Sequence, residues 1–121
     1  MYETDFVMKM IKDISRALAK ILFNKDSQTL MEEQLEKYQS GDEDNNLFLL
    51  ADDGRIEDAE NILSEMMETE DVDELALAFY EYINMFDDNF LIEHNFSRDE
   101  IKLGIENIVR KRGLENLLVQ L

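Results

Sequence analysis

The sequence contains no cysteine and no proline, and it has only four glycines and one histidine among its 121 residues. Without cysteine there can be no disulfide framework, no thiol nucleophile and no zinc-thiolate site, and a reducing compartment suits the chain. Without proline there are few helix breakers, and the abundant Leu, Glu, Met, Lys and Ala favour helices. We therefore predict an all-α fold.

Long apolar runs are absent as well. No stretch approaches the ~20 apolar residues that span a bilayer. Lys and Arg interrupt the apolar residues near the N-terminus, and no small-residue cleavage site follows them, so no signal peptide is predicted. We expect a cytoplasmic protein with a single domain over residues 1–121. Its predicted parts are an N-terminal helical pair (1–40), a core (42–113) and a final turn (114–121).

Basic residues are scarce. The chain has 12 Lys and Arg against 29 Asp and Glu, a net charge of −17. A phosphate backbone would be repelled, so we expect no nucleic-acid partner. The charge is uneven, because residues 1–25 carry five basic and three acidic groups whereas residues 26–121 carry seven basic and twenty-six acidic groups. The N-terminal segment is therefore attracted to the rest of the chain.

Residues 72–86 are predicted to form the central helix, because apolar side chains cover most of its circumference. One stripe consists of Leu75, Phe79, Tyr82, Ile83 and Phe86, widened by neighbours that include Ala78 and Met85. Only Asp73, Glu74, Glu81 and Asn84 mark a solvent-facing side. Such a helix must be covered by other helices, which predicts a bundle of about six helices arranged as antiparallel hairpins.

The segment 5–22 is predicted to be an amphipathic helix. Nine apolar residues fall in an arc of about 160°, and four basic residues cluster on the other side. The basic residues are Lys9, Lys12, Arg16 and Lys20. The apolar arc has three interpretations: it packs on the domain's own core, forms the seam of a homodimer, or lies on an anionic membrane. The net negative charge of residues 26–121 argues against the interpretation that this helix lies on an anionic membrane.

Capping patterns mark the helix ends. We predict that Thr29 and Glu32 open a second helix that ends near Ser40-Gly41, and that Asp71 with Glu74 caps the central helix. Ser97 with Glu100 predicts the start of a helix that stops at Gly113. Within that helix, Gly104 marks a position where two backbones could approach closely.

A helix hairpin with a tight turn at Gly54 is predicted around residues 44–67. The run Gly54-Arg55-Ile56-Glu57-Asp58-Ala59 resembles the turn of a tetratricopeptide repeat (TPR), although Leu47 stands at a position that this motif keeps small. Together with Phe79-Tyr80, Phe96-Ser97 and Gly104, it resembles an uncharacterised family of small, acidic bacterial helical proteins. That resemblance implies a TPR-like core and no particular activity.

Few residues suggest catalysis or metal binding. The turn at Asp53 resembles part of an EF-hand loop, but its first ligand positions would be Leu49 and Ala51, which cannot bind calcium. His94 has no neighbour in sequence that would orient it as a base. The triplet 110–112 is interpreted as the basic end of a helix. We therefore expect no enzyme activity, no metal and no cofactor.

The sequence instead suggests a non-catalytic helical protein–protein interaction module that self-associates. Stacked hairpins leave a groove, and an acidic body favours a basic or amphipathic partner segment. The alternative is a peripheral membrane or assembly factor that docks through its basic N-terminal helix. The candidate interaction surface comprises Lys9, Lys12, Ile14, Arg16, Leu18, Lys20, Met66 and Met67.

Overall fold

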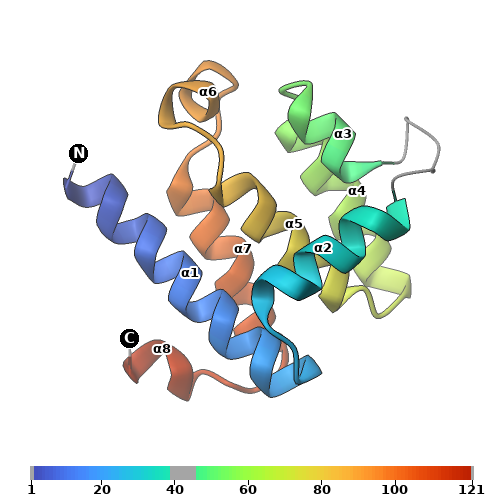
Figure 1. Cartoon of the computed structure of the whole chain (residues 1–121), viewed down its shortest axis with the longest axis vertical. Helices are drawn as coiled ribbons and strands as arrows, with labels where there is room; N and C mark the ends of the chain where they lie inside the picture. The colour runs from blue at the N-terminus through green and yellow to red at the C-terminus, as the bar shows by residue number, and fades with distance from the viewer. Residues whose placement is uncertain (1, 39–45, 121) are drawn as a thin grey trace.

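The computed structural model describes residues 2–38 and 46–120. In these segments the chain is helical, with no strand, as predicted (Figure 1). The helices are α1 (Tyr2–Phe23), α2 (Ser27–Tyr38), α3 (Leu47–Asp52), α4 (Ile56–Thr69), α5 (Asp73–Asn84), α6 (Asp88–Glu93), α7 (Arg98–Lys111) and α8 (Asn116–Gln120). These eight exceed the expected six by the short helices α6 and α8, and α8 lies in the segment predicted as a final turn.

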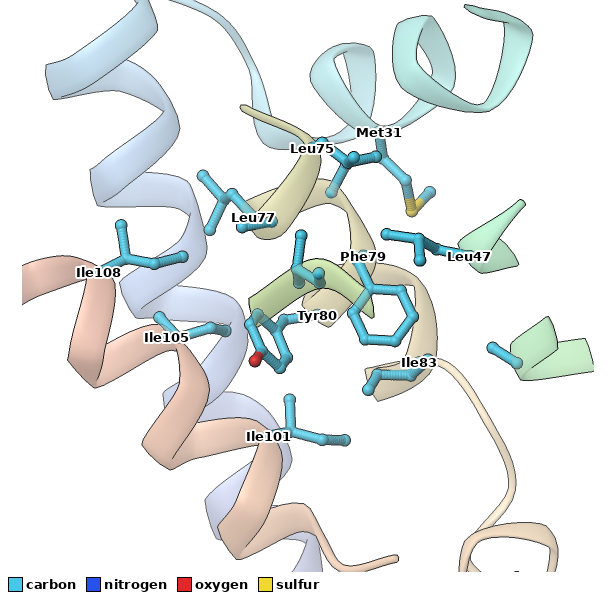
Figure 2. Packing of buried hydrophobic residues seen from close by; sticks show 14 of the residues in the cluster. Met31, Leu47, Leu75, Leu77, Phe79, Tyr80, Ile83, Ile101, Ile105 and Ile108 are labelled. Carbon is cyan, nitrogen blue, oxygen red and sulfur yellow. The ribbon is translucent and has the colours of Figure 1, made fainter. Parts of the chain in front are cut away.

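Helix α5 is the central helix, as its apolar circumference predicts. It packs against α1 and α7 on one side and against α2 and α3 on the other (Figure 1). The side chain of Phe79 is 0% exposed. In Figure 2, Phe79 lies toward Leu47 of α3, while three isoleucines of α7 line the side nearer Tyr80. The core is therefore built around both faces of α5.

The prediction of a solvent-facing side on α5 was wrong for Asp73 and Asn84, whereas Glu74 and Glu81 are half-buried. Asp73 and Asn84 are buried, at 0% and 1% exposed. Both residues meet partners from other elements instead of water: Lys111 and Arg112 bind Asp73, while Asn84 accepts from Arg98 and donates to the carbonyl oxygen of Met8 in α1. The apolar prediction also fails at Met85, directly after the helix, which is 59% exposed.

Two glycines explain close contacts between helices. Gly54, in the turn between α3 and α4, has a φ of +84°, which favours glycine. A Cβ at this position would also clash with the His94 ring, so both the backbone and the packing require a glycine. A Cβ at Gly104 would lie 2.3 Å from the ring of Tyr80. The predicted close approach at Gly104 is thus between the α7 backbone and an aromatic side chain of α5.

The predicted cap of α7 is confirmed, and two others are corrected. Ser97 and Glu100 form a reciprocal capping box. Helix α2 begins at Ser27, where Asp26 accepts a hydrogen bond from the Gln28 N–H (3.0 Å), so Thr29 lies inside the helix. Val72 occupies the cap position of α5. The Asp71 carboxylate nevertheless accepts a hydrogen bond from the backbone N–H of Asp73. The predicted stop at residues 40–41 lies outside the described residues.

Aromatic rings form a continuous row from α3 to α6. Successive ring centroids lie 4.4–5.5 Å apart, in the order Phe48, Tyr82, Phe86, Phe90 and His94. The last ring covers Gly54, so the row ends on the turn that follows α3. In the part of the chain that is described, no helix is long and apolar enough to cross a bilayer.

Candidate functional site

The inner face of α1 belongs to the core of its own domain. Ile14 and Leu18 are 1% and 0% exposed, and α1 packs on α5 and α7. Their prediction as interaction residues is therefore wrong: an apolar arc signals burial, but its period does not identify the covering surface.

The outer face of α1 remains open. Lys9, Lys12, Arg16 and Lys20 are exposed, as expected from their position opposite the buried arc. Beside them the arc ends in an apolar edge, where Phe6 is 64% and Ile21 53% exposed. Nine apolar residues are thus more than α1 needs for its own core, and the outer face combines positive charge with exposed apolar surface.

The other predicted contact residues, Met66 and Met67, lie on α4, half-buried against the core. They line neither of the two hollows described below. Met85, which follows α5, is the methionine at the surface of a hollow. Met31 of α2 lines the same hollow.

One hollow opens between α1, the start of α2 and the end of α5. We call it the basic hollow, and its volume is about 640 Å³. It is lined by Lys12, Arg16, Lys20, Lys25, Asp26, Ser27, Gln28, Met31, Glu81, Asn84 and Met85. Four cations thus border one cavity of a strongly acidic chain.

Within residues 2–38 and 46–120, three of these cations form no ion pair. Eight of the 12 basic residues form ion pairs within 4.0 Å in the described segments. Lys12, Arg16 and Lys20 form none there, whereas Lys25 is bound by Glu33 and Glu74. The remaining cation, Lys37, lies over the Tyr38 ring outside the hollow. The unpaired positive charge is therefore concentrated in the basic hollow.

Glu81 faces the same hollow from α5. Its Oε2 atom is buried and has no hydrogen-bond partner among the described residues. Burial raises the pKa of the Glu81 carboxyl, and the charge of Asp26 adds to the rise. The Ser27 hydroxyl and the cations Arg16 and Lys12 act in the opposite direction. The Glu81 carboxyl therefore takes up a proton at a higher pH than an exposed glutamate does.

A second hollow lies between α2, α3 and the end of α5. We call it the acidic hollow; its volume is about 490 Å³, and it is lined by Glu32, Leu35, Glu36, Asn46, Phe48, Leu49, Asp52 and Tyr82. The Tyr82 hydroxyl donates to Asp52 at 2.6 Å, and burial together with this carboxylate raises the pKa of Tyr82 to about 12. Leu49 is exposed beside the acids. An apolar floor thus carries a negative rim, which suits a basic amphipathic segment.

Two buried charged residues, Arg98 and Asp73, stabilise the fold, and neither was predicted to be buried. Arg98 donates to the backbone oxygens of Asn84 (2.7 Å) and Phe86 (2.6 Å) and to Asp88 (3.0 Å), and it thereby caps the carbonyl end of α5. An arginine in the first turn of a helix interacts unfavourably with the helix dipole. This unusual position was the feature of the sequence that could have indicated a structural role for Arg98. Lys111 and Arg112 bind the buried Asp73. The triplet 110–112 is therefore a helix end, as interpreted, and all three of its members are also ion-paired, Arg110 with Glu106 at 4.0 Å.

The single imidazole is held by packing. His94 Nδ1 lies 2.8 Å from the carbonyl oxygen of Phe90, and the ring lies against Phe90 and Gly54. Another buried polar contact joins α4 and α5, where the Tyr80 hydroxyl donates to Glu60 at 2.9 Å. Burial raises the pKa of Glu60.

Comparison with known proteins adds a family and no activity. No curated protein and no solved structure matched the chain, so the resemblance of the α3–α4 hairpin to a TPR repeat stays a prediction. A family model described as "Family of unknown function (DUF6483)" matches residues 1–113. That match covers nearly the whole chain, including both hollows and the residues that line them, and the chain therefore belongs to this family of unknown function.

Proposed function

We propose that the chain is a non-catalytic protein–protein interaction module that self-associates. In this proposal the outer face of α1 in one copy docks on the acidic hollow of another. The observation that supports it is that one chain carries two complementary, unpaired surfaces: a basic stripe with an apolar edge, and an apolar floor with an acidic rim. The cysteine-free composition suits the reducing cytoplasm, which we propose as its location.

The C-terminal half of α1 matches the size and chemistry of the acidic hollow. Arg16 and Lys20 stand one turn apart, and Ile21 adds an exposed apolar side chain beside them. Across the interface, Glu32 and Glu36 also stand one turn apart. In a twofold dimer this contact is made twice, which compensates for the small gain from each exposed ion pair, about 1 kcal/mol at most.

A charge swap tests the proposal. One variant carries Arg16→Glu and Lys20→Glu, and the other carries Glu32→Lys and Glu36→Lys. Each variant alone faces like charges across the interface and is expected to be a monomer, whereas the equimolar mixture regains both contacts and forms a heterodimer. Sedimentation at ~100 μM and low salt is the measurement, because association worth ~8 kcal/mol acts at micromolar concentration.

The controls separate a specific contact from general charge effects. Glu65→Lys with Glu68→Lys changes the net charge as the second variant does, but on the exposed side of α4, and is expected to leave the dimer intact. Circular dichroism verifies that each variant is folded. A monomeric wild-type protein at ~100 μM, or a mixture that stays monomeric, would refute self-association through these surfaces.

Membrane docking through α1 is a second candidate, favoured by the exposure of Phe6 and Ile21 beside the basic stripe. The buried face of α1 is not available for it, so only this edge could enter a lipid surface. Flotation with anionic vesicles distinguishes the candidates: we expect the wild-type protein to stay with the soluble fraction. Flotation that is abolished by Phe6→Glu with Ile21→Glu would favour the membrane instead.

A further inference from the structure

We propose that the basic hollow binds a compact oligophosphate anion, either free or carried by a nucleoside. The site consists of Lys12, Arg16 and Lys20, which line one cavity of about 640 Å³ without an acidic partner in the described segments. The binding of this ligand does not rest on the self-association proposed above, but both use Arg16 and Lys20 of α1, so the two would compete.

The missing ion pairs are informative because acids are abundant. With 29 acidic residues in the chain, most cations find a carboxylate, and eight of the 12 do so in the described residues. Three cations left unpaired around one hollow repel each other unless an anion joins them. The two acids that line the hollow form no ion pair with these three cations within 4.0 Å: Asp26 accepts a hydrogen bond from the first turn of α2, and Glu81 is half-buried and interacts with Lys12 and Arg16 only at longer range.

The spacing of the cations suits a short chain of phosphates. Residues four apart on a helix stand one turn apart, so Lys12, Arg16 and Lys20 form a ladder about 12 Å long. Arginine can bind phosphate oxygens with two parallel hydrogen bonds, and lysine adds a point charge. The start of α2 also borders the hollow, but its first turn already binds the Asp26 carboxylate, so the three cations of α1 are the groups left for an anion. Several phosphates in one molecule can thus be met at once.

The rest of the chain favours a compact anion over a polymer. Residues 26–121 carry seven basic and twenty-six acidic groups. A long nucleic acid that entered the hollow would run over this acidic surface and be repelled on both sides. An anion that fits within the hollow avoids that repulsion.

Glu81 gives the site a proton-linked signature. A bound anion next to Glu81 favours the protonated carboxyl, so binding takes up a proton and tightens as the pH falls. The groups that face this carboxyl are Asp26 and Ser27 at the start of α2 and the cations Lys12 and Arg16 of α1. Its pKa is already raised by burial. In Glu81→Gln the opposing charge is gone at every pH, so this variant is expected to bind several-fold more tightly and with a smaller pH dependence.

Isothermal titration calorimetry with sodium tripolyphosphate tests the proposal. The protein carries Glu32→Lys with Glu36→Lys, so that self-association does not compete, and the wild-type protein is measured in parallel. We expect one saturable site per chain. Lys12→Gln with Arg16→Gln should weaken binding at least about tenfold. Lys9→Gln with Lys37→Gln removes the same charge outside the hollow and should change affinity by less than about twofold.

The remaining arms identify the ligand and can overturn the site. Orthophosphate should bind more weakly than tripolyphosphate, and ATP should bind at least as well, since its nucleoside can lie along Met31 and Met85. Absence of saturable binding up to ~1 mM, about 4 kcal/mol, would overturn the proposal. So would an equal loss in the Lys9/Lys37 variant, or tighter binding of single-stranded DNA than of tripolyphosphate. Because the calorimetry uses a monomeric variant, a failure of self-association leaves its outcome unaffected.

Discussion

Arg112 Nε donates to Asp73 Oδ2 at 2.6 Å, and Lys111 Nζ binds the other oxygen of the same carboxylate at 3.0 Å. Asp73 is fully buried at the start of α5, whereas both cations come from the end of α7, almost forty residues later. The negative charge favours the N-terminus of α5, and the cations favour the C-terminus of α7. One ion-pair cluster therefore stabilises two helix ends and joins them.

Asp73→Asn is expected to destabilise the protein by about 2–3 kcal/mol, because two cations lose a buried, charged acceptor. The measurement is the free energy of unfolding from urea denaturation. Asp71→Asn is the matched control: Asp71 also binds Arg112, but it is exposed, and its loss should cost less than about 1 kcal/mol. Equal effects at the two positions would contradict the role given to burial.

Arg98→Lys is expected to cost about 2–4 kcal/mol despite keeping the charge. Lysine cannot reproduce the planar fork that reaches the carbonyls of Asn84 and Phe86 together with Asp88, so buried oxygens at the end of α5 lose their donors. Arg110→Lys, at an exposed position of α7, serves as the control and should change the free energy of unfolding by less than about 0.5 kcal/mol. Similar values for both variants would count against the capping role of Arg98.

Phe79→Ala is expected to lower the free energy of unfolding by about 3–5 kcal/mol, because it leaves a cavity between α5 and its neighbours. Phe6→Ala deletes the same ring from an exposed position and should cost less than about 0.5 kcal/mol. Chemical denaturation of the two variants provides the comparison. A loss below ~1 kcal/mol for Phe79→Ala would mean that the core is not centred on α5.

Stability is expected to rise as the pH falls from neutral towards the ordinary pKa of a glutamate, about 4.5. Burial raises the pKa values of Glu60 and Glu81 above those of the unfolded chain, so the folded state binds more protons in this range. Protonation therefore favours the fold, and the gain is lost as the pH rises through the folded-state pKa values. Differential scanning calorimetry across this range measures the effect.

Single substitutions assign the pH effect to the buried carboxyls. Glu81→Gln should raise the melting temperature at about pH 7.5 and reduce its pH dependence. Glu65→Gln removes one negative charge at an exposed position and controls for the relief of net repulsion. If the two variants behave alike, net charge and not the burial of Glu81 governs the pH dependence.

Most of the fold could be predicted from the helical periodicity of apolar residues and from the capping residues. They predicted the buried α5 from its apolar circumference, the cap at Ser97 and the turn at Gly54, because each depends on residues close in sequence. Asp73 and Asn84 were misplaced because a polar residue on a helix says nothing of a partner on a distant helix. Arg98 reaches Asn84 across 14 positions, a contact that no local pattern encodes.

The candidate site was only partly predictable for the same reason. The basic stripe of α1 follows from its spacing, but the basic hollow also needs Ser27 from α2 and Glu81 from α5. Ile14 and Leu18 were assigned to an interface because the amount of apolar surface on α1 exceeds the needs of one core. That excess is real, but it lies at the edge of the arc, on Phe6 and Ile21.

The aromatic row contacts α3 at one of its ends and the turn that follows α3 at the other. Phe48 leaves α3 at one end of the row, and His94 returns to the turn that follows α3. Phe48 and Tyr82, which both line the acidic hollow, pack edge-to-face with their ring centroids 5.2 Å apart, and Tyr82 packs in turn on Phe86. A partner segment of the kind proposed above would meet side chains already held by these contacts, so little conformational entropy would be lost there on binding.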